Sequence, residues 1–255
     1  MIYNNFLFIH IPKSGGSSME KMFLGEHKLI DFTIKHIFKD SKFTRWIVGT
    51  MRNRGWRVFI FYIVSFFFKD LVSLWGIKNG KVLQHLTYQE TLNEKYLTKE
   101  KMDELVKFCI VRNPYDRLIS AYHFLGNNMT FSQFVSYVYK ELDDYYRKKI
   151  EPFVVIKPQI EFVMDNEGKN KMDEVLYFEN LQEDFENFCQ KYKLEKNKLP
   201  HINRRVRDKK NIKEYYDQRL ADMVYHIYRL DFKAFGYKKL IFKRKKKPKA
   251  EEKSQ

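Results

Sequence analysis

Cysteine is scarce in this sequence, which excludes a protein stabilised by a network of disulfides and one stabilised by a cysteine-rich zinc site. The 255 residues contain two cysteines, Cys109 in an apolar run and Cys189 in a helical pattern. Two such residues make no disulfide framework, and no His/Cys spacing typical of a zinc site occurs. No Asp/His cluster suggests another metal. We therefore expect a protein that needs no metal and that resides in a reducing compartment.

Segments that would direct the chain to a membrane are also missing. The N-terminus lacks a basic segment followed by an apolar segment and a small-residue cleavage site, which predicts a cytoplasmic protein. The apolar run Val58 to Phe68 has 11 residues, whereas a spanning helix needs about 20. Lys69 and Asp70 follow it directly. We predict that the stretch 56–76 is a buried helix or hairpin; the alternative is an interfacial patch that contacts a membrane or an apolar acceptor.

Acidic residues are outnumbered by basic ones, 32 Asp and Glu against 48 Lys and Arg, which predicts an anionic partner. The formal net charge is +16, and residues 243–255 hold seven Lys/Arg and two Glu, a net +5 that leaves +11 on the rest. The tail 243–255 is a like-charge run that we expect to be disordered. Since the body is basic by itself, phosphorylated cofactors, acidic polysaccharides, anionic membranes and nucleic acids all remain open as partners at this level.

Buried-type strands alternate with helical segments along the chain. The apolar runs 6–11, 107–111 and 175–178 are each followed by a helical pattern. Further helices are predicted over residues 130–142 and 215–228, the latter ending before Asp231. This alternation predicts an α/β fold with a central parallel sheet flanked by helices. We expect one domain over residues 1–242, with an apolar insertion at about 56–76, and then the basic tail.

The first of these runs leads into a glycine-rich turn that could hold an anion. Ile11 and Pro12 end the strand, and Lys13-Ser-Gly-Gly-Ser-Ser18 precedes a helical pattern. Backbone N–H groups converge at a helix N-terminus, and the glycines Gly15 and Gly16 would let the backbone approach a phosphate closely. Lys13 precedes the glycines, unlike the lysine of a Walker A loop. An ordinary Gly-Ser turn is the alternative.

The second run ends at an arginine. Arg112 follows the strand at the edge where open parallel sheets bind ligands, and Ser120 lies eight residues on, about two helical turns later. A guanidinium and a hydroxyl could bind a second phosphate. Alternatively, Arg112 is a structural ion-pair partner, for example of Asp116.

Together the two segments resemble the sulfotransferase superfamily, in particular the carbohydrate sulfotransferases of the Golgi type and their bacterial and viral relatives. Ile11–Ser18 is similar to that family's I-P-K-[ST]-G-[GA]-[ST]-S loop, and Val111–Tyr122 to its V-R-N-P-[YFW]-[DE]-R-[LF]-[VI]-S-x-[YF] segment. The resemblance covers about residues 5–237, and the apolar stretch, the basic tail and the missing N-terminal anchor depart from it. Further landmarks follow in the family's order: Lys157–Gln159, Phe178–Leu181, Leu199–Asn203 and Tyr228–Tyr237.

The resemblance implies a P-loop-like fold and a donor, 3′-phosphoadenosine-5′-phosphosulfate. Lys13 would stabilise the leaving phosphate as the S–O bond breaks. The backbone N–H groups of residues 14–18 (Ser14, Gly15, Gly16, Ser17 and Ser18), with the hydroxyls of Ser17 and Ser18, would hold the 5′-phosphate. Arg112 and Ser120 would bind the 3′-phosphate, and Arg204 would close over the nucleotide. No metal is implied.

A general base must remove the proton of the acceptor hydroxyl. His85 follows a predicted short strand, at a position where similar family members carry a histidine that faces the acceptor, so we predict that His85 is the base. His10 precedes the turn and is predicted to be a packed core residue. A structural role for His85, with an acidic residue as the base, is the alternative.

Three classes of function remain. The first is a sulfotransferase that acts on a hydroxyl, for which we predict a glycan acceptor, no specific nucleic-acid partner, and peripheral membrane contact through residues 56–76 or the tail. The second is a P-loop-like nucleotide kinase. The third is a catalytically degenerate relative that binds an anion or a glycan.

Overall fold

The structure is a computed structural model that describes residues 2–3, 5–16, 18–19, 77–78, 81–82, 85–93, 97–125, 128–194 and 212–242. The chain divides into two compact units, one built from Met1–Arg112 and Phe153–Arg205, the other from Asn113–Pro152 and Val206–Gln255. Our predictions for the stretch 56–76, for Ser17, for Arg204 and for the tail 243–255 lie outside the described residues.

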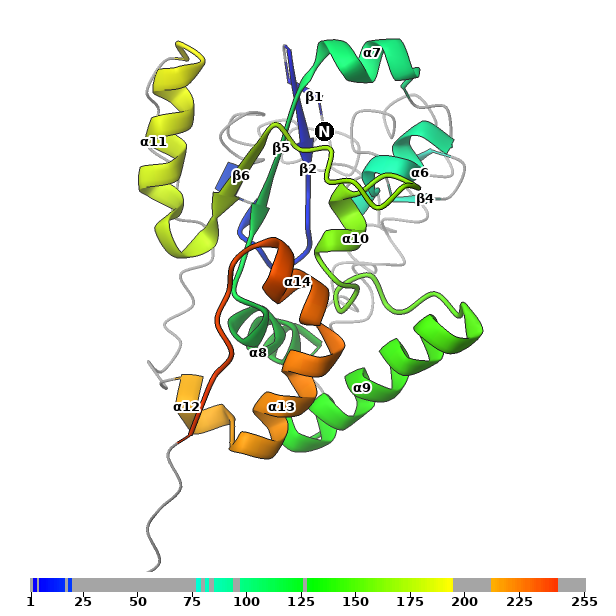
Figure 1. Cartoon of the computed structure of the whole chain (residues 1–255), viewed down its shortest axis with the longest axis vertical. Helices are drawn as coiled ribbons and strands as arrows, with labels where there is room; N and C mark the ends of the chain where they lie inside the picture. Colours follow the sequence, from blue (N-terminus) through cyan, green and yellow to red (C-terminus); the bar gives the residue numbers. More distant parts are fainter. Residues whose placement is uncertain are drawn as a thin grey trace, which may run out of the picture. The chain divides into compact units, whose positions relative to one another are not determined.

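A four-stranded sheet forms the centre of the first unit (Figure 1). Its order is β1 (Ile2–Tyr3), β2 (Phe6–Ile9), β5 (Val106–Val111) and β6 (Glu174–Tyr177). β2 and β5 are parallel, with Phe6 opposite Val106, and β5 and β6 are parallel, with Val111 opposite Tyr177. β1 pairs antiparallel with β2 at the edge. The predicted α/β fold with a parallel sheet and flanking helices is therefore confirmed.

The sheet is buried because its strands carry apolar residues on both faces. Phe8 and Phe108 face the core together with side chains of helix α11 (Leu181–Lys191), and Cys109, the next residue of β5, is buried as well. The Phe188 ring of α11 lies 5.4 Å from that of Phe6 and 4.8 Å from that of Phe108. β2 is buried throughout and β5 from Lys107 onward, which is typical of central parallel strands, whereas β6 is only partly buried.

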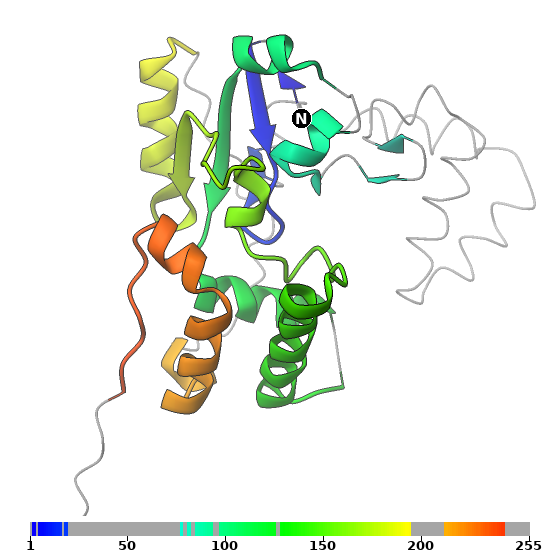
Figure 2. The ribbon, with the colours of Figure 1, turned by 45° about the vertical axis from the view of Figure 1, so that its right-hand side comes forward.

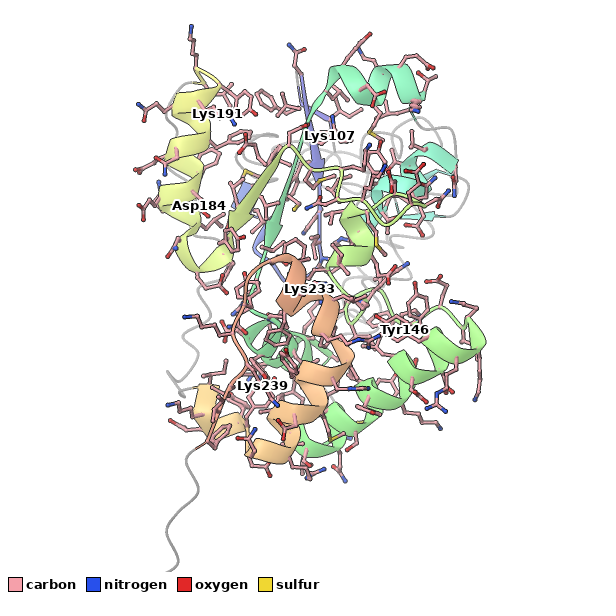
Figure 3. All side chains as sticks on the ribbon, in the orientation of Figure 1. Lys107, Tyr146, Asp184, Lys191, Lys233 and Lys239 are labelled. Carbon is pink, nitrogen blue, oxygen red and sulfur yellow. The ribbon has the colours of Figure 1, made fainter. Side chains whose placement is uncertain are left out.

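Helix α11 is fixed to β6 at both of its ends, and Figure 3 labels the two α11 residues responsible. Near the N-terminus of α11, the Asp184 carboxylate accepts a hydrogen bond of 2.6 Å from the Tyr177 backbone N–H. In the last turn, Lys191 forms an ion pair with Glu174. Asp184 also lies in the first turn, where the helix dipole favours a negative charge.

Shorter elements complete the first unit. β3 (Ile77–Lys78) and β4 (Lys81–Val82) form a small antiparallel hairpin, and α6 (Tyr88–Asn93) and α7 (Lys99–Glu104) lead into β5. Buried Lys107, at the start of β5, forms an ion pair of 3.0 Å with Asp173 and donates a hydrogen bond of 2.8 Å to the Leu105 carbonyl after α7. Helix α10 (Ile160–Val163) and the 3-10 helix η3 (Phe178–Asn180) follow later.

The described part of the second unit is helical (Figure 2). Its elements are α8 (Pro114–Leu125), α9 (Phe131–Lys148), α12 (Ile212–Tyr215), α13 (Gln218–Ile227) and α14 (Arg229–Ala234). Buried Tyr115 joins them, since its ring packs against Tyr216 and Phe232 and its hydroxyl donates to the Ala221 carbonyl. Among the described helices, none combines the length and the apolar character needed to cross a bilayer.

Two helix predictions in this unit are wrong, each for a local reason. The pattern predicts one helix over residues 215–228 that ends before Asp231, but Asp217 starts a new helix by accepting a hydrogen bond from the Leu220 N–H, and α14 includes Asp231. The pattern also ends α9 at Leu142. The helix continues to Lys148, because ion pairs between residues four apart, Asp143 with Arg147 and Asp144 with Lys148, stabilise its polar last turns.

Candidate functional site

Three loops leave the carboxyl ends of the parallel strands and meet at one edge of the sheet. The Lys13-bearing loop follows β2, Arg112 follows β5, and Phe178 follows β6. Open α/β sheets bind their ligands at this edge. All three loops belong to the first unit, so this unit alone defines the geometry given below.

The loop after β2 has an unusual backbone at Lys13. This residue adopts φ 68°, in the left-handed region that side chains other than glycine rarely enter, and Gly15 follows with φ 93°. The backbone then turns helical at Gly16, and the Ser18 N–H donates to the Gly15 carbonyl at 3.1 Å. Left-handed conformations held by surrounding structure are concentrated at ligand sites. The loop therefore has the strand–turn–helix geometry that the sequence predicts for anion binding.

Both glycines of this loop are needed for a reason that the sequence did not reveal. A β-carbon built on Gly15 would lie 2.7 Å from Cδ2 of Phe178, and one built on Gly16 would lie 2.1 Å from Cδ2 of His10. Real β-carbons essentially never approach other atoms so closely. The glycines thus let two aromatic rings pack directly against the loop.

Gln159 joins the loop to the end of β5. Its side chain is fully buried, its Oε1 accepts hydrogen bonds from the Arg112 N–H at 2.9 Å and from the Ser14 hydroxyl at 3.3 Å, and its Nε2 donates to the Arg112 carbonyl at 2.8 Å. The Ser14 hydroxyl therefore points inward, and any contact of Ser14 with an anion has to come from its backbone N–H. Sequence reasoning placed Gln159 only among the family landmarks.

Contacts with the Lys13 backbone and the Phe178 ring orient the Arg112 guanidinium. Its Nη1 donates to the Lys13 carbonyl at 3.3 Å, and its Cζ lies 4.1 Å from the centre of the Phe178 ring. A cation over an aromatic face is attracted by the ring quadrupole. The arginine is thereby oriented and also supports the left-handed turn at Lys13. Phe178 is a second site residue that sequence reasoning did not single out.

His85 lies beside the same loop. Its Nδ1 is 3.1 Å from the His10 carbonyl oxygen, and the two imidazole rings are 4.6 Å apart between centres. A carbonyl only accepts hydrogen bonds, so Nδ1 carries the proton and the lone pair of the neutral ring resides on Nε2. This is the tautomer that a general base acting through Nε2 requires.

The remaining predicted site residues are placed less fully. Ser120 is buried in α8 of the second unit, Ser18 lies partly exposed at the helical start, and Ser17 and Arg204 are outside the described residues. Both cysteines are buried, and burial raises the pKa of the Cys109 thiol well above its ordinary value, which keeps it protonated. In the described ranges, no three His, Cys, Asp or Glu residues are grouped as metal ligands would be.

The bridging role of Gln159 makes a stability prediction. Replacing it by leucine removes the partner of the buried Arg112 N–H and carbonyl, and each buried group left unpaired costs about 1–3 kcal/mol. We expect Gln159→Leu to lower the free energy of unfolding in urea by at least this amount. Gln182→Leu is the control, because the Gln182 amide makes an exposed hydrogen bond to Glu186 on one helix face. If both variants lose an equally small amount of unfolding free energy, Gln159 does not stabilise the junction of Ser14 with Arg112.

The chain was compared with known protein families, curated proteins and solved structures. The family model described as "Sulfotransferase family" matches residues 3–238, which include all the loops described above. Comparisons with curated proteins and with solved structures find no match.

Proposed function

This chain belongs to the sulfotransferase family, and on that premise we propose that it transfers a sulfuryl group from 3′-phosphoadenosine-5′-phosphosulfate to an acceptor hydroxyl. The observation that carries the proposal is the junction of the Lys13 loop with Arg112 at the carboxyl edge of the sheet, made by Gln159 and by the Lys13 carbonyl.

The residues at this edge fit a nucleotide with two phosphate groups. The loop from Lys13 to Ser18 combines a lysine, two glycines without side-chain bulk and backbone N–H groups at a helix start, which suits the 5′-phosphosulfate. Arg112 supplies a planar cation for the 3′-phosphate, with one N–H already used by the Lys13 carbonyl. Ser120 remains a proposed second ligand of that phosphate.

The proposed chemistry assigns one role to His85 and one to Lys13. The oxygen of the acceptor hydroxyl attacks sulfur, a new S–O bond forms, and the bond between sulfur and the phosphate oxygen breaks. His85 Nε2 takes the proton of the hydroxyl, which its tautomer allows. The Lys13 ammonium stabilises the negative charge that the leaving phosphate oxygen gains.

A carbohydrate is the acceptor we propose. A basic body favours an acidic saccharide, since attraction between opposite charges raises the rate of encounter. The anionic donor also benefits from this charge, so the choice of acceptor rests on experiment.

The test uses the purified chain and the donor labelled in its sulfate group. Label should pass to a hydroxylated acceptor in a panel of acidic and neutral glycans, sterols, tyrosine peptides and small alcohols. A parallel thermal-shift experiment separates the classes of function: adenosine 3′,5′-bisphosphate should raise the melting temperature more than ATP does. Preference for ATP would indicate a kinase, and equal small shifts would indicate a degenerate binding protein.

A further inference from the structure

The imidazole of His10 contacts both the loop over residues 13–18, the proposed phosphate-binding loop, and His85, the proposed base. The side chain is buried, its ring stacks on that of Phe8 at 5.6 Å between centres, and it meets the His85 ring at 4.6 Å with the planes 66° apart. On another side it is so close to Gly16 that a β-carbon there would be 2.2 Å from its Nε2.

The backbone of the same residue also holds His85. The His10 carbonyl accepts the hydrogen bond from His85 Nδ1 at 3.1 Å, so ring and carbonyl of one residue act on one imidazole. The position of His10 is itself fixed, because His10 directly follows β2, whose residues are buried throughout, and is buried too. From this buried position the His10 ring contacts both the loop at Gly16 and the His85 ring.

We propose that His10 is a positioning residue whose imidazole sets the distance between the phosphate-binding loop and the His85 ring. The inference rests on the proposed function, because it takes His85 to be the base and the loop to hold the donor. The acceptor hydroxyl has to reach sulfur and Nε2 together, and a misplacement of about 1 Å can cost about 10²-fold in rate. Glycine at position 16 is needed for the spacing that the His10 ring imposes.

A double-variant cycle on nucleotide binding tests the spacing without any acceptor. Gly16→Ala should weaken the binding of adenosine 3′,5′-bisphosphate about tenfold or more, because its new methyl group collides with the His10 ring. His10→Ala should change that affinity little, and the double variant His10→Ala/Gly16→Ala should recover most of the loss, since the methyl group then has space.

The matched control is Gly15→Ala, whose methyl group would meet Phe178 and not His10. His10→Ala should bring no recovery to this variant. If Gly16→Ala fails to fold but the double variant folds, the recovery of folding itself supports the proposal, because removing the His10 ring makes space for the methyl group. Additive losses at positions 10 and 16, or rescue of Gly15→Ala to the same extent, would overturn the proposal.

Two further readouts address His85 directly. Nitrogen-15 spectra of the histidine rings in the native chain should show His85 with its proton on Nδ1, and a proton on Nε2 alone would contradict the hydrogen bond to the His10 carbonyl from which the proposal starts. In the transfer assay, His10→Ala should lower kcat about 10²-fold with nucleotide affinity kept, and His10→Phe, which retains a flat ring on Phe8, should recover part of it. Undiminished kcat in His10→Ala would also overturn it.

The two proposals fail in different ways. A native chain that transfers no sulfate to any acceptor counts against the proposed function, while the binding cycle and the ring spectra still decide whether His10 spaces the loop and His85.

Discussion

Alanine at position 85 is expected to lower the rate of sulfuryl transfer about 10²–10⁴-fold, the usual cost of losing a general base. Nucleotide affinity should hardly change, because the proposed phosphate ligands lie on the loop after β2 and at Arg112. The hydrogen bond from Nδ1 to the His10 carbonyl leaves Nε2 as the nitrogen that can accept the acceptor's proton. In the native enzyme the rate should rise with pH through the range in which histidines titrate, about pH 5–8, and this limb should vanish in His85→Ala.

His226→Ala is the control for this variant, since His226 is exposed on α13 of the second unit and its ring stacks on Tyr139. It should keep both the rate and the shape of the pH profile. Near-native turnover of His85→Ala with a true acceptor would remove His85 as the base and turn attention to a carboxylate.

Lys13→Ala should lower both turnover and affinity, which separates it from His85→Ala. An ammonium that touches the donor before reaction contributes to binding, and a charge-assisted contact is worth about 1.5–3 kcal/mol. The same ammonium stabilises charge that develops on the leaving oxygen, and removal of one such group costs about 10²–10³-fold in kcat. Kinetics and calorimetry on the same preparation measure the two losses.

The left-handed backbone of Lys13 calls for a control that shares it. Lys149, the exposed C-cap of α9, has φ 58°, close to the 68° of Lys13, so Lys149→Ala alters a lysine in the same conformation that is not part of the loop after β2. It should leave turnover and affinity unchanged. A Lys13→Ala variant that loses affinity without losing kcat would show that this lysine binds the donor but does not stabilise the leaving group.

The strands and the glycine-serine turn after β2 could be predicted because their signals are local. An apolar run, a proline and a glycine-serine turn in sequence define the end of β2, and the Arg112 segment similarly marks the end of β5. Parallel pairing then brings both ends to one edge of the sheet, as the alternation of strands and helices indicates.

The contacts that tie the site together could not be predicted, because they join residues far apart in the chain. Gln159 meets Arg112 across 47 positions and Ser14 across 145, and no periodicity records such a pairing. The left-handed turn at Lys13 could not be predicted either, because position 13 is neither glycine nor asparagine. The Arg112 side chain, which follows β5, supports this turn. Glycines 15 and 16 were attributed to phosphate approach alone, and the packed rings of Phe178 and His10 give a second reason for both.

The most direct test of the central claim compares two nucleotides on native and Arg112→Ala protein by calorimetry. If this edge of the sheet holds the 3′-phosphate, the variant should lose about 1.5–3 kcal/mol of affinity for adenosine 3′,5′-bisphosphate and much less for adenosine 5′-phosphate. Arg112 also supports the Lys13 turn, a role that would affect both nucleotides alike. An equal loss for the two nucleotides would therefore contradict the assignment of Arg112 to the 3′-phosphate.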